Sequence, residues 1–285
     1  MKLEHIKTVG VVGTGIMGSG IAQVFAQAGF TVLVHDISDD ALKNAKASIE
    51  KSLNKFVSKG KFTENQAKET LNRLTMSNNV GDLKSVQMVI EAVTENEQIK
   101  TKVFQKLNDI CPKDSIFASN TSTIPIGRLA KNVDKPDRFI GMHFMNPVPL
   151  MKLVEIINGF HTSNETTKVV CALAEKLDKT VVVSKDFPGF IVNRVLMPLI
   201  NEAIFTLYEG VATKEDIDQA MTLGTNHPIG PLALADLIGL DTCLSIMEVI
   251  FEGFKDSKYR PCPLLRQYVE AGHLGRKSGR GFYVY

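Results

Sequence analysis

The sequence has few cysteines, little net charge and no long uninterrupted apolar segment. Its four cysteines are widely spaced and form neither a CxxC pair nor a zinc-binding pattern, which indicates reduced thiols in a cytoplasmic protein and no metal site. A net charge of +2 gives no support for nucleic acid as a partner. The most apolar stretches, 188–208 and 231–251, are interrupted by charged and amide side chains, so we expect neither to cross a membrane.

The distribution of strand and helix patterns divides the chain into two parts. Its 285 residues are 44% hydrophobic and 22% charged, the composition of a globular protein long enough for two domains. The N-terminal segment leads directly into a strand pattern and lacks the apolar core of a signal peptide. Strand patterns alternate with helical ones up to about residue 186, and only helical periodicity follows. We predict an α/β domain over 1–186 and an all-α domain over 187–285.

Seven strands are expected in the first domain, at 8–12, 31–35, 87–93, 115–118, 138–144, 153–157 and 180–184. Helical patterns lie at 16–28, 97–110 and 164–177. After Asp36 a serine- and aspartate-capped helix runs toward Gly60, and a second helix over about 64–73 completes a hairpin. The alternation is typical of a parallel, doubly wound sheet with a mixed edge.

The segment VGVVGTGIMGSG carries a dinucleotide-binding fingerprint. Gly13-x-Gly15-x-x-Gly18 follows a predicted strand directly and opens a helix. In this motif the glycines form a tight turn, let the backbone approach a pyrophosphate and let helix and strand pack closely. The N-terminus of the helix then binds the phosphates. The alternative is a glycine-rich turn that binds nothing. We predict a Rossmann-type domain whose cofactor loop is Gly13, Gly15, Ile16, Met17 and Gly18.

Asp36 ends the next strand, 18 residues after Gly18, and indicates which cofactor is bound. A carboxylate there accepts hydrogen bonds from a ribose 2′-hydroxyl. Against a 2′-phosphate, like charges about 4 Å apart repel by about 4 kcal/mol at an effective dielectric constant of about 20. Ile37 and Ser38 offer no arginine for that phosphate. NAD is therefore favoured over NADP, although a solvated surface aspartate is the alternative.

The predicted hairpin is strongly basic. Residues 41–68 contain seven lysines and only two acidic side chains. Ser52, Lys55 and Lys59 are spaced i, i+3 and i+7, so they share one helix face. Such a face suits an anionic ligand, and coenzyme A carries several phosphate charges. A solvated helix surface is the equal alternative on these residues alone.

His143 and Glu155 each lie inside an apolar strand pattern, joined by an Asn146-Pro-Val-Pro turn. A charge in such a run is costly to bury unless it is paired. Because the strands are close in sequence, the turn can bring the glutamate beside the histidine. A dehydrogenase needs a base near neutral pH for the substrate hydroxyl, and a carboxylate orients such an imidazole. The alternative is a core histidine with a solvent-facing glutamate.

Six further motifs extend the pattern over essentially the whole chain. They are SNTST at 119–123, GMHFMNP at 141–147, KLVEII at 152–157, DFPGFIVNR at 186–194, NHPIGPLALADLIGLD at 226–241 and GRKSGRGFYVY at 275–285. With the glycine fingerprint, they make the chain resemble the 3-hydroxyacyl-CoA dehydrogenases, and most closely their bacterial 3-hydroxybutyryl-CoA type. One departure is Thr123, where many relatives have serine, but a hydroxyl is kept.

The resemblance implies NAD-dependent interconversion of (S)-3-hydroxyacyl-CoA, such as 3-hydroxybutyryl-CoA, and 3-oxoacyl-CoA, such as acetoacetyl-CoA. It implies His143 as the catalytic base and Glu155 as its partner, with Ser122 and Asn193 at the reacting end of the substrate. The implied cofactor contacts are Glu95, Lys100, Ser122, Asn146 and Lys277. The implied coenzyme A contacts are Ser52, Lys59, Lys100 and, more weakly, Lys55. Family members commonly dimerise through the helical domain.

Two other functions are compatible with parts of the pattern. Related β-hydroxyacid dehydrogenases act on free acids, typically with a catalytic lysine, and do not need a lysine-rich hairpin for coenzyme A. A dinucleotide-binding protein without turnover, like the lens crystallin that resembles this family, needs no acid/base pair. The presence of His143, Glu155, Ser122 and Asn193 favours the CoA dehydrogenase.

Overall fold

The computed structural model describes residues 2–285. The chain forms two compact units that divide between Phe187 and Pro188. This division is one residue beyond the boundary that the sequence indicated. The first unit is an α/β structure and the second is helical, so the predicted fold class is confirmed.

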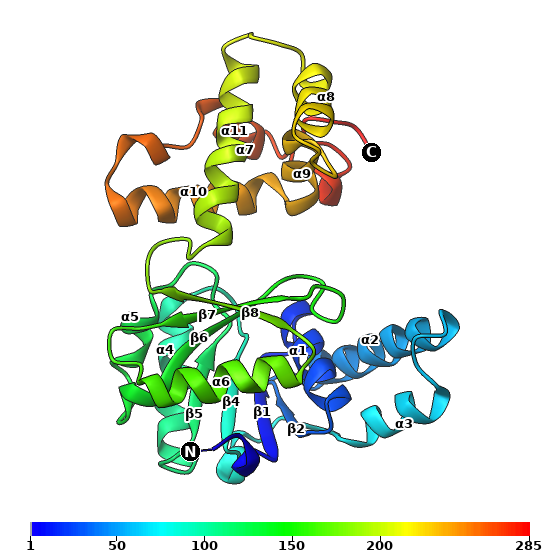
Figure 1. The fold of residues 1–285 in the computed structure, drawn as a ribbon, viewed down its shortest axis with the longest axis vertical. Helices are drawn as coiled ribbons and strands as arrows, with labels where there is room; N and C mark the ends of the chain where they lie inside the picture. The colour runs from blue at the N-terminus through cyan, green and yellow to red at the C-terminus, as the bar shows by residue number, and fades with distance from the viewer. Residues whose placement is uncertain (1) are drawn as a thin grey trace. The chain divides into compact units, whose positions relative to one another are not determined.

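An eight-stranded sheet forms the centre of the first unit (Figure 1), with the strand order β3-β2-β1-β4-β5-β6-β7-β8. The strands are β1 (Thr8–Val12), β2 (Thr31–His35), β3 (Leu74–Ser77), β4 (Met88–Glu91), β5 (Ile116–Ser119), β6 (Phe139–Phe144), β7 (Leu153–Asn158) and β8 (Thr180–Lys185). All neighbours are parallel except β6 and β7, which are antiparallel. The mixed edge expected from the sequence is therefore present.

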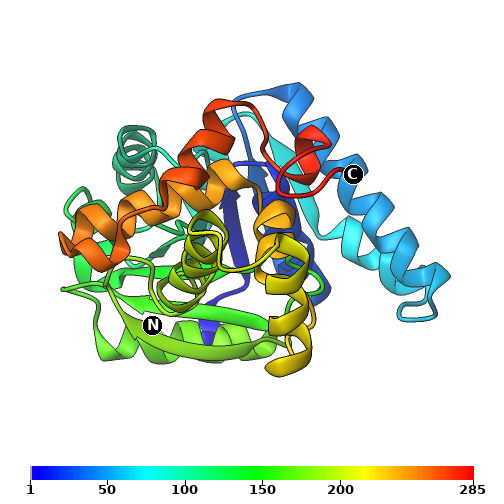
Figure 2. The same ribbon diagram turned by 90° about the horizontal axis from the view of Figure 1, so that it is seen from above.

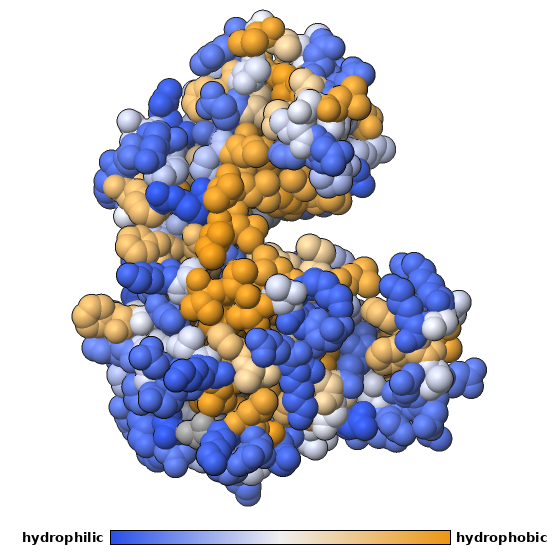
Figure 3. Space-filling view, in the orientation of Figure 1, coloured by the Kyte–Doolittle hydropathy of each residue, from blue (hydrophilic) through white to orange (hydrophobic). Residues whose placement is uncertain are grey.

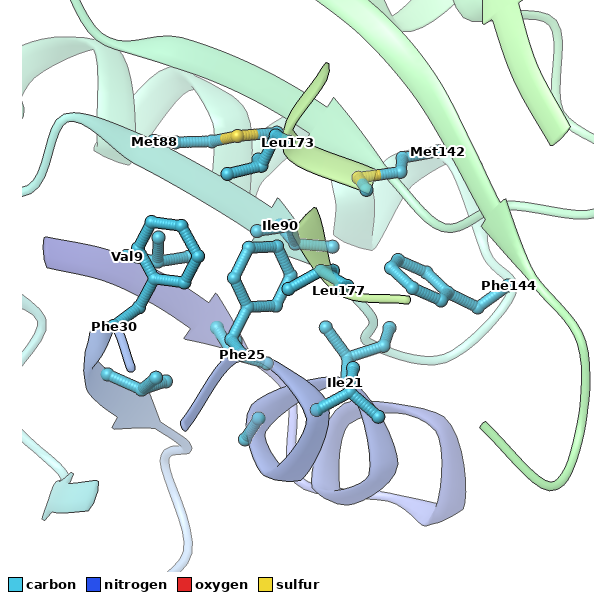
Figure 4. Packing of buried hydrophobic residues seen from close by; sticks show 14 of the residues in the cluster. Val9, Ile21, Phe25, Phe30, Met88, Ile90, Met142, Phe144, Leu173 and Leu177 are labelled. Carbon is cyan, nitrogen blue, oxygen red and sulfur yellow. The ribbon is translucent and has the colours of Figure 1, made fainter. Parts of the chain in front are cut away.

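Helices cover both faces of the sheet. Helices α1 (Ile16–Gln27) and α6 (Asn164–Lys176) lie on one face, and Figure 4 shows Phe25 and Leu173 converging on side chains of the strands. Helices α4 (Glu97–Ile110) and α5 (Ile126–Ala130) lie on the other, where Phe104 packs edge-on against Phe139 with ring centroids 4.6 Å apart. Burial on both faces explains why the strand sequences are nearly continuous apolar runs.

Strand β3 and helix α5 were not among the elements predicted from the sequence. Strand β3 has only four residues, Leu-Thr-Met-Ser, lies at the sheet edge beside β2, and is only partly buried. Helix α5 has five residues. Neither element is long enough for a periodic pattern to distinguish it from a loop.

The predicted helical hairpin consists of α2 (Asp39–Ser58) and α3 (Glu64–Asn72) and projects from the β2 side of the sheet in both ribbon views (Figures 1 and 2). The Ser38 side chain caps α2, and Thr63 with Gln66 forms a capping box for α3. Gly60 turns the chain between them with φ of +66°. Figure 3 shows a largely hydrophilic hairpin surface with apolar residues exposed between the two helices.

The second unit packs its helices around α7 (Val192–Tyr208) (Figure 1). The others are α8 (Lys214–Gly224), α9 (Pro231–Ile238), α10 (Leu240–Phe254) and α11 (Pro263–Glu270). Short 3₁₀ turns occur at Leu3–His5, Val80–Ser85, Pro136–Arg138, Ser257–Tyr259 and Arg276–Ser278. Ile200 and Ile204 of α7 meet Leu232 and Met247 in a separate core. Within residues 2–285, none of the helices has the length and apolar character needed to cross a membrane.

Candidate active site

The glycine loop lies where the strand order reverses, at the carboxyl ends of β1 and β4. Gly13 has φ of +96°, and a Cβ there would lie 2.6 Å from the carbonyl oxygen of Ala92. A Cβ on Gly18 would lie 1.8 Å from the Gly13 carbonyl oxygen. A Cβ on Gly15, by contrast, would meet no atom within 4 Å. Two glycines therefore permit close packing, and the third leaves an open approach to the backbone, as a pyrophosphate requires.

The N-terminus of α1 completes this cradle. Its N-cap residue is Gly15, which provides no side-chain hydrogen bond to the first turn. The first amides of a helix lack intrahelical acceptors and carry partial positive charge. Ile16 is 78% exposed, so this turn faces solvent. The predicted loop residues therefore fit the phosphates of a dinucleotide.

Asp36 stands at the end of β2 and is bonded to the same loop. Its Oδ2 accepts hydrogen bonds from the backbone N–H (2.9 Å) and hydroxyl (2.8 Å) of Thr14. Its Oδ1 accepts from the backbone N–H of Ser38 at 3.1 Å. Each carboxylate oxygen has two acceptor sites, so Oδ1 retains capacity for a ribose hydroxyl. These bonds hold the carboxylate where it can accept from a ribose 2′-hydroxyl and would repel a 2′-phosphate.

A buried ionic network lies beside the cradle, at the end of β4. The Lys100 ammonium is 2.7 Å from Oε1 of Glu91 and 3.2 Å from Oε2 of Glu95. Lys100 and Glu91 are 1% and 0% exposed, and Glu91 also accepts from the Ser119 hydroxyl at 2.6 Å. Burial raises the pKa of Glu91 above its ordinary value, although Lys100 and Ser119 oppose the rise. Lys100 therefore lies inside the unit, enclosed by two carboxylates.

Glu95 connects this network to the SNTST loop that follows β5. Its Oε1 accepts from the backbone N–H groups of Ser122 (2.9 Å) and Thr123 (3.1 Å). It also accepts from the hydroxyls of Thr121 (2.6 Å) and Thr123 (2.9 Å). Burial acts to raise the pKa of Glu95, but Lys100 and these donors outweigh it and hold the pKa below its ordinary value. The carboxylate thus anchors the loop that carries Ser122.

His143 and Glu155 form a direct pair across two strands. The antiparallel register of β6 and β7 sets them opposite each other, and Nδ1 of His143 is 2.7 Å from Oε2 of Glu155. Both are buried, at 8% and 0% exposure. When Glu155 is ionised, its carboxylate only accepts hydrogen bonds, so Nδ1 is then the donor in this pair. The geometry therefore holds the imidazole in one orientation.

Strand alternation explains which face this pair occupies. Met142 and Phe144, the neighbours of His143, point into the core beneath α1 and α6. His143 consequently points to the opposite face, where Ile126 of α5 packs against Gly141 two residues earlier. The Asn120 side chain accepts from the backbone N–H of Phe144 at 2.9 Å. This bond ties the SNTST loop, which carries Ser122, to the end of β6, the strand that carries His143.

A basic pocket of about 330 Å³ lies between the hairpin and the turn after β6. Its lining residues are Ser48, Lys51, Ser52, Lys55, Phe56, Lys59, Lys61, Pro147, Pro149 and Leu150. Ser52, Lys55 and Lys59 are thus gathered on one wall, as their helical spacing predicted. The apolar wall comes from the turn that begins at Asn146, which is itself exposed. The pocket combines cations with an apolar surface in the same unit as the His–Glu pair.

Two predicted site residues belong to the second unit. Asn193 is the second residue of α7 and is buried. Lys277 is exposed and its ammonium lies 2.6 Å from Oδ2 of Asp241. The segment after Lys277 is pinned by the buried Asp236, whose carboxylate accepts from the backbone N–H groups of Phe282 and Tyr283 at 2.9 Å each. The C-terminal segment is therefore an ordered part of this unit.

The sequence analysis missed Glu91 and Ser119, which complete the buried network. Glu91 lies in the apolar run Met-Val-Ile-Glu-Ala-Val, so it carries the same signal that identified Glu155: a charge where burial is expected. Ser119 had no comparable signal. Lys100 was expected to contact ligand; its ammonium lies between Glu91 and Glu95, and the expected ligand contact stays a prediction.

Together, the cradle at the reversal of strand order, the aspartate after β2 and the paired histidine define a nucleotide-dependent oxidoreductase of the Rossmann class. Comparison with known proteins gives the family. The NAD-binding domain model of the 3-hydroxyacyl-CoA dehydrogenases matches residues 8–187, and the model of their C-terminal domain matches residues 189–285. The chain belongs to the 3-hydroxyacyl-CoA dehydrogenase family.

Individual relatives agree with this assignment. A probable 3-hydroxybutyryl-CoA dehydrogenase of Bacillus subtilis is 56% identical over 281 residues, which cover 99% of this chain and 98% of the relative. The mitochondrial hydroxyacyl-coenzyme A dehydrogenase of Rattus norvegicus is 43% identical over 288 residues, covering 98% of this chain and 91% of the relative. The crystal structure of (S)-3-hydroxybutyryl-CoA dehydrogenase PaaH1 from Ralstonia eutropha superposes with a TM-score of 0.96 at 51% identity, covering 98% and 99% of the two chains.

These matches confirm the resemblance read from the motifs. They also confirm that the chain is an NAD-dependent enzyme.

Proposed function

We propose that the chain interconverts (S)-3-hydroxybutyryl-CoA and acetoacetyl-CoA with NAD as the redox partner. The observation that carries this proposal is the buried pair of His143 and Glu155, 2.7 Å apart, in the same unit as the glycine cradle and the basic pocket. The names of the relatives from Bacillus subtilis and Ralstonia eutropha support the choice of a four-carbon acyl group.

His143 is the proposed acid/base. In the direction of reduction, its imidazolium donates a proton to the substrate oxygen as C3 becomes a secondary alcohol. The glycine loop at Gly13, Gly15 and Gly18 would hold NADH, whose nicotinamide would supply the hydride for C3. We assign the proton exchange to Nε2, because Nδ1 is bonded to Glu155. Glu155 keeps the ring oriented and stabilises its positive charge, and positioned proton transfer of this kind accelerates reactions by about 10²–10⁴.

The polar residues around this pair have proposed supporting roles. We propose that Ser122 donates to the substrate oxygen. Its loop is anchored by Glu95 and by the bond from Phe144 to Asn120, and its own hydroxyl donates to Oε1 of Glu95 at 3.4 Å. We propose that Lys100 acts through Glu95 rather than by touching ligand, because its side chain is 1% exposed. On the family resemblance alone, Asn146, Glu95 and Lys277 are proposed cofactor contacts and Asn193 is a proposed substrate contact.

The basic pocket is the proposed binding site for the coenzyme A moiety. Lys51, Lys55, Lys59 and Lys61 line it, and cations close to phosphate groups stabilise such a ligand. The apolar wall formed by Pro147, Pro149 and Leu150 suits the less polar pantetheine chain. A free hydroxy acid has no coenzyme A moiety and would leave this pocket empty.

We further propose a homodimer formed through the second unit. Val195 on α7 and Leu237 on α9 are 65% and 52% exposed in the single chain, and exposed apolar side chains are enriched where subunits meet. Light scattering coupled to size-exclusion chromatography tests this assembly. A monomer at micromolar concentration would rule it out.

The deciding experiment measures NADH oxidation with acetoacetyl-CoA for the wild type and for His143→Gln, with NADPH and free acetoacetate as controls. Turnover that requires NADH, the thioester and His143 is the expected result. Equal turnover of free acetoacetate, indifferent to His143, would favour a β-hydroxyacid dehydrogenase. NADH binding without any turnover would favour a non-catalytic dinucleotide-binding protein. Equal rates with NADPH would contradict the role given to Asp36.

A further inference from the structure

A buried lysine lies beneath the turn that joins the two catalytic strands. Lys179 immediately precedes β8 and is 8% exposed. Its ammonium donates to the backbone carbonyl oxygens of Val148 at 2.6 Å and of Met151 at 2.8 Å. Thirty-one and 28 residues separate these partners in the sequence. Nothing in the sequence pattern drew attention to this lysine, and the proposed mechanism does not use it.

The turn that Lys179 holds, residues 147–151, links three parts of the first unit. Pro147, Pro149 and Leu150 line the basic pocket. Val148 is 2% exposed and lies against α1, where a Cβ on Gly20 would approach its Cβ to 2.8 Å. The turn's own bonds, from the N–H groups of Leu150 and Met151 to the Pro147 carbonyl, close only its near end. Lys179 donates to the carbonyl oxygens of Val148 and Met151, which take no part in these two bonds.

A buried cation at this position is costly. Burial and the nearby Lys152 lower the pKa of Lys179 below its ordinary value, and Asp178 opposes this only in part. An apolar side chain would avoid that cost, but it would leave the two carbonyls without their donor. The buried ammonium is offset by what it binds, because it donates to the carbonyl oxygens of Val148 and Met151 at the same time.

We propose that Lys179 is a positioning residue that clamps turn 147–151 and thereby fixes the apolar wall of the basic pocket. The substrate part of this inference rests on the proposed function, in which that wall contacts the acyl-CoA. The His143–Glu155 pair is held separately by the β6–β7 register. Loss of the clamp therefore affects substrate binding more than the chemical step.

The test compares Lys179→Met with Lys179→Arg and with a matched control, Lys152→Met. Lys152 adjoins the same turn but is exposed, and it pairs with Asp178 at the surface. For Lys179→Met, the KM for acetoacetyl-CoA is expected to rise about tenfold while kcat changes less than about threefold. Arginine retains the donors and should restore most of the loss. Lys152→Met should match the wild type.

A second readout does not depend on turnover. Hydrogen–deuterium exchange of the peptide covering 144–153 should become about tenfold faster in Lys179→Met and stay unchanged in Lys152→Met. If the methionine variant does not fold, Lys179→Gln takes its place, since its shorter amide cannot reach both carbonyls. If the wild type fails to turn over acetoacetyl-CoA, the proposed function falls, and the exchange comparison still decides the role of Lys179.

Unchanged exchange and unchanged KM in the lysine variants would overturn the clamp. A lower thermal stability together with a lower kcat and a higher KM, without a local change in exchange, would also overturn it. That second pattern would identify Lys179 as a general stabilising residue.

Discussion

The first unit contains two buried acid–base pairs of nearly equal geometry. His143 lies 2.7 Å from Glu155, and Lys100 lies 2.7 Å from Glu91. Both glutamates are 0% exposed, and both interrupt apolar strands of the same sheet. The difference lies in the cation. An imidazole exchanges a proton near neutral pH, whereas an ammonium keeps its proton under the same conditions.

This difference assigns the pairs to different work. Lys100 shares its charge between Glu91 and Glu95, and Glu95 in turn anchors the loop that holds Ser122. Such a network rigidifies its surroundings when every member is satisfied. The His143–Glu155 pair instead holds an imidazole, the side chain that enzymes use most often as a general acid or base. A buried glutamate is therefore informative only together with the group it is bonded to.

The sharpest way to break the comparison is His143→Gln. Glutamine approximates the size of the ring but cannot exchange a proton, so kcat for acetoacetyl-CoA reduction should fall about 10⁴-fold. NADH binding, followed by fluorescence titration, should be unchanged. His161→Gln, at an exposed histidine, is the matched control and should retain full activity. A loss below tenfold in His143→Gln would mean that the pair is structural, like that of Lys100.

The second variant, Glu155→Gln, keeps the shape of the pair and removes its charge. The imidazolium loses its stabilising partner and the ring loses the acceptor that orients it, so kcat should fall about 10³-fold. The measurement is kcat for acetoacetyl-CoA reduction at pH 7, beside that of the wild type. An unchanged kcat would contradict the role of Glu155.

Much of this unit follows from local sequence. The β-branched runs at 8–12 and 31–35 are followed by Gly13 and Asp36, and the strands β1 and β2 have these bounds in the structure. The pairing of His143 with Glu155 could be expected because a short turn joins two strands with one charge each. Strand β3 could not be predicted, because four partly exposed residues at a sheet edge are too few to show a strand pattern.

The parts of the site that could not be predicted depend on contacts between different elements of the fold. The sequence does not indicate that Lys100 meets Glu91, because the spacing of nine residues crosses a strand end, a loop and a helix turn. Lys179 bonds a turn about 30 residues away. Such contacts depend on how the sheet and helices pack, and local sequence patterns do not predict that packing.

The third variant tests the structural pair. Lys100→Met leaves the Glu91 carboxylate buried without its cation, which should lower the free energy of unfolding by about 3 kcal/mol. The double variant Lys100→Met/Glu91→Gln removes that charge and should recover part of the loss. Urea denaturation measures both. Lys102→Met, at an exposed lysine of the same helix, is the control, and an equal loss in that variant would refute the assignment.

The smallest effect is the pH dependence that Glu95 contributes. Its pKa in the folded protein lies below the ordinary value of 4.5, so between these two values the unfolded chain binds more protons than the folded one. Stability from Glu95 is therefore fully present above about pH 4.5 and is lost as the pH falls through the folded value. Because the side chain is 37% exposed, the contribution should be at most about 1 kcal/mol.

Urea unfolding of the wild type and Glu95→Gln at pH 7, 5, 4 and 3 measures this contribution. The wild type should be more stable at pH 7 and 5, and the difference should shrink below pH 4. Glu91→Gln should change in the opposite direction, because burial raises the pKa of Glu91 and its contribution falls as the pH rises above about 4.5. If the stability difference from the wild type follows the same trend with pH in both variants, the pKa values of Glu95 and Glu91 are not shifted in opposite directions, and this prediction is wrong.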